Sequence, residues 1–67
     1  MHVTVNGKPR ELASPLNLRE LLESHNVNPA MCAVEYNGEI VRRERFAEVL
    51  LQEGDKLEII HMVGGGA

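Results

Sequence analysis

The C-terminal segment contains the residues whose types and order could take part in chemistry. It reads Gly64-Gly65-Gly66-Ala67 and follows an apolar run over residues 57–63. A glycine carboxylate is a poor electrophile until one of its oxygens becomes part of a leaving group, as in an acyl-adenylate. After activation, the absence of a side chain leaves the carbonyl carbon open to a nucleophile. An ordinary frayed chain end is the competing interpretation, because termini with nothing to bury are commonly disordered.

Other potentially reactive side chains fit structural roles. Cys32 alternates with Val34 and Tyr36, which is typical of a small apolar residue on the inner face of a strand. His25 and His61 stand in apolar patterns, where packed histidines are commoner than ligands. No cluster of Cys and His residues has the spacing of a zinc site, so we expect no bound metal.

The remaining charged residues do not form a catalytic constellation. No pair of carboxylates and no nucleophile with a nearby base stands out, so we expect no catalytic residue and no enzyme activity in this chain. Arg42, Arg43 and Arg45 indicate a solvated connection, with the steering of a partner as the alternative.

Length and composition predict one small domain. The chain has 67 residues, of which 43% are hydrophobic, and its single cysteine excludes an internal disulfide. We expect residues 1–63 to form the domain and residues 64–67 to form a flexible tail. The net charge of −3 and the presence of only one Tyr and one Phe argue against nucleic-acid binding. Neither a membrane span nor a signal peptide is evident, which predicts a cytoplasmic location.

The N-terminal third predicts a hairpin followed by a helix. Residues 2–6 alternate polar and apolar, and Asn6-Gly7 favours a tight turn into a return strand over residues 8–12. Pro9 lacks an N–H group, so the return strand should lie at a sheet edge. Asn17 precedes Glu20 by three residues and predicts a helix start, and the helix should continue to about His25.

The rest of the chain predicts three more strands. Residues 31–36 form one strand, Asn37-Gly38 a second tight turn, and residues 39–41 a short returning strand. Phe46 and Val49, with Leu50 or Leu51, should anchor the following connection in the core. Gly54-Asp55 then turns the chain into the apolar final strand, which is typical of a central strand. With the final strand placed beside the first and the helix across one sheet face, the predicted fold is an α+β β-grasp domain with a mixed sheet of four to five strands.

One face of this sheet should remain uncovered. Ala33, Ile60 and Met62 share the face opposite the helix by strand parity, and no second helix is predicted to cover them. Exposed apolar groups of this size commonly mark interaction sites. We therefore expect these three residues to form a partner-docking surface.

Four stretches resemble the ThiS family, the ubiquitin-like sulfur carriers of thiamine thiazole synthesis within the ThiS/MoaD superfamily. The resemblance covers essentially the whole chain, in order, and the Glu-x-Asn-Gly-Glu-Ile-Val segment is its most specific part. The four stretches are residues 5–7, 33–42, 54–60 and 61–66.

The resemblance implies a function for the tail. A family member's C-terminal glycine is adenylated by an E1-like, ThiF-like enzyme that uses ATP and Mg²⁺, so the carrier itself binds no cofactor. A persulfide donor then converts the glycine to a thiocarboxylate, which supplies sulfur to a ThiG-like thiazole synthase. Gly65 and Gly66 fall on the family's diglycine, with Gly64 before them. Members usually end in glycine, so Ala67 is either trimmed, an added residue, or a sign that the chain is not charged as it stands.

Two alternatives remain open at this point. One is the small subunit of molybdopterin synthase, which shares the fold and the tail chemistry but serves a different acceptor. The other is a ubiquitin-like binding module whose tail never reacts.

Overall fold

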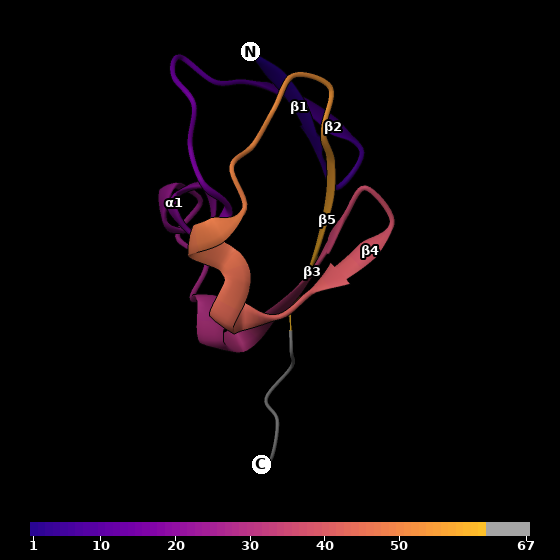
Figure 1. Ribbon diagram of the computed structural model, residues 1–67. Helices are drawn as coiled ribbons and strands as arrows, with labels where there is room; N and C mark the ends of the chain where they lie inside the picture. The colour runs from indigo at the N-terminus through magenta and orange to yellow at the C-terminus, as the bar shows by residue number, and fades with distance from the viewer. Residues whose placement is uncertain (62–67) are drawn as a thin grey trace.

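The structure, a computed structural model, describes residues 1–61 as a five-stranded mixed sheet with its helices on one side (Figure 1). The strand order across the sheet is β2-β1-β5-β3-β4. Within this range no helix is long and apolar enough to cross a membrane. The elements are β1 (His2–Val5), β2 (Lys8–Glu11), α1 (Leu18–Ser24), the 3₁₀ helix η1 (Pro29–Met31), β3 (Cys32–Tyr36), β4 (Glu39–Val41), the 3₁₀ helix η2 (Arg43–Glu48) and β5 (Lys56–His61).

The final strand, β5, lies in the middle of the sheet. It runs parallel to β1, with Val5 opposite Leu57, and antiparallel to β3, with Ala33 opposite Ile60. The predicted pairing of the last strand beside the first is therefore confirmed. The strand β5 therefore joins the N-terminal hairpin to the second hairpin in one sheet.

Both predicted tight turns are confirmed. Asn6 and Gly7 have φ angles of 52° and 80°, and Asn37 and Gly38 have φ angles of 50° and 91°. Two successive positive φ angles define the turn whose twist matches two adjacent strands. The strand that follows Asn6-Gly7 is β2, which lies at the edge of the sheet and contains Pro9, as predicted.

The turn asparagines also hold β5 in place. The Asn6 backbone N–H donates to the Leu57 carbonyl over 2.9 Å, while the Asn6 Oδ1 accepts from the Ile59 N–H over 2.7 Å. On the other side, the Asn37 N–H donates to the Lys56 carbonyl and the Asn37 Oδ1 accepts from the Lys56 N–H, both over 2.8 Å. Each side-chain carbonyl takes the place that a main-chain carbonyl would have if its strand continued.

The helix begins where the sequence predicts it. Asn17 Oδ1 accepts from the Glu20 N–H over 2.8 Å, and Glu20 Oε1 accepts from the Asn17 N–H over 2.9 Å. This reciprocal pair is a capping box, which satisfies donors that the first helical turn leaves free. The helix ends at Ser24, with His25 as its C-terminal cap.

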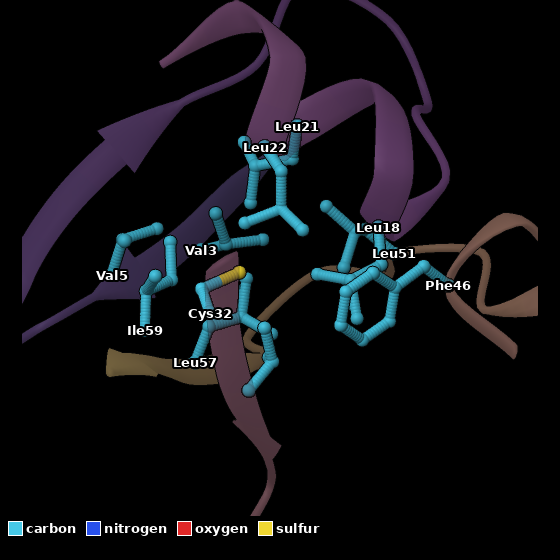
Figure 2. Packing of buried hydrophobic residues seen from close by; sticks show 11 residues of the cluster. Val3, Val5, Leu18, Leu21, Leu22, Cys32, Phe46, Leu51, Leu57 and Ile59 are labelled. Atoms are coloured by element: carbon cyan, nitrogen blue, oxygen red, sulfur yellow. The ribbon is translucent and has the colours of Figure 1, made fainter. Parts of the chain in front are cut away.

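A single apolar core fills the space between the helix and the sheet (Figure 2). Phe46 and Leu51 anchor the connection after β4, whereas Leu50 is 57% exposed, so the structure selects Leu51 from the two predicted anchors. The segment predicted as a charged connection forms the short helix η2 instead, since burial of Phe46 draws it against α1. The buried apolar residues are Val3, Val5, Leu18, Leu21, Leu22, Cys32, Val34, Phe46, Leu51, Leu57 and Ile59.

This arrangement is the predicted β-grasp fold. The described residues form two layers, one containing α1 and η2 and the other containing the sheet, and the core lies between them. The expected boundary between domain and tail, after residue 63, lies outside the described residues.

Replacement of Asn6 tests the contribution of its side-chain carbonyl. Glycine tolerates a positive φ, so Asn6→Gly keeps the turn but leaves the buried Ile59 N–H without its acceptor. We expect the free energy of unfolding to fall by about 1–3 kcal/mol, measured by urea denaturation. Asn6→Ala should cost a further ~1 kcal/mol, because alanine disfavours the left-handed region.

Asn26 supplies the matched control for this measurement. It also has a positive φ, of 58°, but it is exposed and its side chain makes no hydrogen bond to residues 1–61. Asn26→Gly should therefore change the stability by no more than about 0.5 kcal/mol. Equal losses in Asn6→Gly and Asn26→Gly would contradict the role given to the Asn6 side chain.

Candidate functional site

The predicted reactive tail continues from the central strand of the sheet. Gly64, Gly65, Gly66 and Ala67 lie outside the described residues, as does Met62. The last described residue is His61, which pairs with Cys32 at the beginning of β3. The structure therefore specifies the strand that leads to the tail and the surfaces on either side of it.

The face of the sheet away from α1 carries the predicted docking residues. Ala33 and Ile60 are directly opposite each other on β3 and β5, and Ile60 is 49% exposed. The neighbouring residues Cys32 and Ile59 point the other way and are buried in the core. The structure thus brings together two of the three residues that strand parity predicted.

Ile40 is a third apolar residue on the same face, and the sequence analysis missed it. It lies opposite Glu35, two residues from Ala33 along β3, so Ala33, Glu35 and Ile40 face the same way. Ile40 is 64% exposed, more than Ile60. The tight turn at Asn37-Gly38 sets the register of β4, so the sequence contained the signal needed to find it.

Two carboxylates separate the apolar residues. Glu35 on β3 lies directly opposite Glu58 on β5, and like charges at such positions destabilise a sheet. The two glutamates line a shallow hollow of about 150 Å³ together with Gly38 and Lys56. We call the surface made by Ala33, Glu35, Ile40, Glu58 and Ile60 the open face. It combines exposed aliphatic groups with negative charge.

A buried carboxylate holds the beginning of β5. Asp55 is only 7% exposed, and its oxygens accept from the Tyr36 hydroxyl over 2.6 Å, the Asn37 Nδ2 over 3.1 Å and the Gln52 N–H over 2.7 Å. The sequence analysis took Asp55 only as part of a turn. Its burial could not be read from the sequence, because two of its three donors lie 18 and 19 residues away.

The hydrogen bond to Asp55 perturbs Tyr36. Donation to the carboxylate, then partial burial and the negative charge of Asp55, raise the pKa of Tyr36 to about 12. The neutral phenol is therefore the form that the folded protein stabilises. This interaction joins the end of β3 to the beginning of β5.

The environment of Cys32 is that of a structural residue. The side chain is 6% exposed, and its Sγ lies 3.9 Å from the Pro29 carbonyl oxygen. Burial raises the pKa of the Cys32 thiol, which disfavours the nucleophilic thiolate. The structural interpretation of this residue is therefore confirmed for the folded chain.

The histidines and arginines do not converge on a catalytic centre. His25 Nδ1 lies 3.0 Å from the Leu21 carbonyl oxygen, and Arg45 pairs with Glu48 over 3.5 Å at the surface. Arg42 and Arg43 are exposed. Within residues 1–61 no three His, Cys, Asp or Glu side chains are placed to hold a metal ion.

Three comparisons with known proteins point to the same family. The model of the ThiS family matches residues 3–66. The sulfur carrier protein ThiS of Bacillus subtilis is 43% identical over 49 residues, which cover 73% of this chain and 74% of that protein. A crystal structure of the thiamine biosynthesis protein ThiS from Geobacter metallireducens superposes with a TM-score of 0.84 at 39% identity, covering 98% of this chain and all of that one.

The chain also matches part of a larger protein. It is 37% identical over 67 residues to a thiazole synthase of Paramagnetospirillum magneticum. The match includes all of this chain but spans only 21% of the length of that synthase.

The Tyr36–Asp55 hydrogen bond predicts a specific dependence of stability on pH. A tyrosine has a pKa of about 10 in an unfolded chain, and the folded value is about 12. The stabilisation should therefore be complete below about pH 10 and should be lost as the pH rises through about 12. Tyr36→Phe should lower the free energy of unfolding by about 1–2 kcal/mol at neutral pH, allowing for partial exposure.

Urea denaturation of wild type and Tyr36→Phe at several pH values tests this prediction. The difference in stability between the two proteins should shrink as the pH rises above 10, because only the wild type loses the bond. Tyr36 is the only tyrosine in the chain, so ultraviolet absorbance reports its ionisation directly. A difference that stays constant through this range would rule out the proposed linkage.

Proposed function

The chain belongs to the ThiS family, and on that premise we propose that it is a sulfur carrier of thiamine biosynthesis whose C-terminal glycine carries the sulfur. The observation that carries this proposal is the extent of the family match, which runs through Gly66 and so includes the glycine segment as well as the domain. The chain acts as a protein co-substrate in the cytoplasm, and the reactions on its tail are catalysed by its partners.

The proposed chemistry begins with a carboxylate oxygen of Gly66. This oxygen attacks the α-phosphorus of ATP on an E1-like enzyme, and pyrophosphate leaves. The outer sulfur of a persulfide then attacks the carbonyl carbon, and AMP leaves. A thiol reduces the resulting acyl disulfide, which releases the thiocarboxylate and leaves a disulfide on the donor side. ATP and Mg²⁺ belong to the activating enzyme.

We propose that thiazole synthase receives the sulfur. A thiazole synthase is among the relatives of this chain, and its similarity extends over the whole of residues 1–67. A carrier and an acceptor that act together need a surface on which the carrier docks before its glycine reaches the active site.

The open face is suited to this docking. Ile40 and Ile60 offer exposed apolar area, and Glu35 and Glu58 together outweigh the positive charge of Lys56 beside them. Apolar pockets in a partner groove would bury the two isoleucines. A lysine or arginine between those pockets would neutralise the negative charge. We propose that Ala33, Ile60 and Met62, together with Ile40, contact both the activating enzyme and the acceptor.

Adenylation of two matched chains tests the carrier function. A chain that ends at Gly66 should support ATP–pyrophosphate exchange with an E1-like enzyme of the ThiF type. With a persulfide donor, it should gain the mass of sulfur in place of oxygen. A chain that retains Ala67 should be slower by about a hundredfold, because the extra residue displaces the carboxylate by up to about 3.5 Å and adds a Cβ.

The protein that accepts the sulfur distinguishes a carrier for thiazole synthesis from a subunit of molybdopterin synthase. The thiocarboxylate form should transfer sulfur to thiazole synthase and not to the large subunit of molybdopterin synthase. Absence of exchange with either chain would identify a binding module whose tail does not react. Equal exchange by the two chains would refute the requirement for a terminal glycine.

Substitution on the open face tests the docking proposal. Ile60→Asp should lower the free energy of unfolding by about 1–2 kcal/mol and leave the domain folded, because the side chain is half-buried and the new carboxylate lies near Glu35 and Glu58. It should weaken binding to the activating enzyme at least about tenfold, measured by isothermal titration calorimetry.

Leu50→Asp is the matched control. Leu50 is 57% exposed but bridges to Asn17 in the helical layer, away from the open face. Leu50→Asp should leave binding unchanged. If Ile60→Asp unfolds the domain, or if both variants bind equally well, the open face is not the docking surface.

A further inference from the structure

A second concave surface lies on the other side of the sheet from the open face. It is a groove of about 240 Å³ between β2, the C-terminal end of α1 and β5. We call it the basic groove. Its lining residues are Val5, Asn6, Lys8, Arg10, His25, Val27, Ile59 and His61.

Every ionisable side chain that lines this groove is basic. Lys8 and Arg10 come from β2, His25 from the cap of α1, and His61 from the end of β5. None of the ten acidic residues of the chain lines it, although the net charge of the chain is −3. The positive groove is therefore a local reversal of the overall charge.

The register of the sheet explains why these cations gather. Lys8 lies opposite Val5 and Arg10 lies opposite Val3, and both valines point into the core. Lys8 and Arg10 therefore lie on the helix side of the sheet, at the edge that α1 does not cover. Neither forms an ion pair with any of residues 1–61.

A hydrogen bond orients the ring of His25. The Nδ1 atom lies 3.0 Å from the Leu21 carbonyl oxygen, which can only accept, so Nδ1 carries a hydrogen. The Nε2 atom is therefore the ring nitrogen that remains available to a ligand in the groove.

We propose that the basic groove binds a small tetrahedral oxyanion, of the kind presented by sulfate or by a phosphate group. Lys8, Arg10, His25 and His61 supply the donors and the charge, and each of these residues lines the groove. The apolar side chains of Val5, Val27 and Ile59 line the rest of the groove and would accept a short carbon substituent on the anion. The proposal does not depend on the sulfur-carrier function, which uses the tail and the open face.

Titration of the full chain with sodium sulfate tests the proposal, because sulfate is the simplest anion of the proposed kind. Amide chemical shifts are followed by NMR, with sodium chloride added to hold the ionic strength constant. Saturable shifts should appear at Asn6, Lys8, Arg10, His25 and His61, with a dissociation constant of about 1 mM near pH 6. The absence of saturable shifts at these residues up to about 20 mM would overturn the proposal.

Charge variants identify the residues that hold the anion. Lys8→Gln and Arg10→Gln should each weaken binding about threefold, and the double variant about tenfold. Arg43→Gln is the matched control, since it removes the same charge from an exposed residue outside the groove. Equal weakening by Arg43→Gln and Arg10→Gln would show that only the general charge of the chain matters, and would refute a site.

The histidine pair provides an independent test. The double variant His25→Gln/His61→Gln should bind sulfate about fivefold more weakly than the wild type at the same pH, because two of the four basic side chains that line the groove are lost. Thermal unfolding of each variant confirms that the domain is folded before the titration. Equal affinity in the double variant and the wild type would refute the assignment of these histidines to the site.

Discussion

The backbone of β5 needs hydrogen-bond partners along both of its sides, because it is the central strand and its inner residues are buried. Neither neighbouring strand is long enough to supply them alone: β1 ends at Val5 and β3 ends at Tyr36. Asn6 and Asn37 complete the pairing with their side-chain carbonyls while their positive φ angles turn the chain away. Each of the two asparagine-glycine turns thus has two structural roles. They reverse a strand, and they bind the strand that arrives last in the sequence.

Asp55 extends the same arrangement to the beginning of β5. Its carboxylate gathers donors from Tyr36, Asn37 and Gln52, so the turn before β5 is joined to the turn after β3. A buried carboxylate is costly unless its oxygens are satisfied, and here three donors satisfy them. The strand that leads to the C-terminal glycines is therefore held at its start as well as along its sides.

The small size of the domain leaves its two surfaces with different properties. The helices α1 and η2 cover part of a single sheet face, so the opposite face stays open, with Ile40 and Ile60 exposed and the Glu35–Glu58 pair half-buried. On the covered side, α1 is too short to reach the edge strand β2, and the uncovered margin becomes the basic groove. The acidic open face and the basic groove lie on opposite sides of the strand that continues into the tail. A partner on one face would leave the other free.

The local pattern of the sequence by itself determined the five strands, the main helix and the family, but not the two 3₁₀ helices. Both asparagine-glycine turns, the Asn17 cap and the alternation of β1 were readable because each depends on residues within four positions of one another, and the terminal glycines with the segment around Glu35–Val41 indicated a ThiS-like carrier. Strand parity also placed Ala33 and Ile60 together. Only the tertiary structure showed that Asp55 is buried, that Asn6 and Asn37 bind β5, that Leu51 rather than Leu50 enters the core, and that Lys8, Arg10, His25 and His61 meet in one groove. These features join residues 15 to 53 positions apart in the chain, and burial and proximity at such separations follow from how the strands and the helix pack rather than from any local preference.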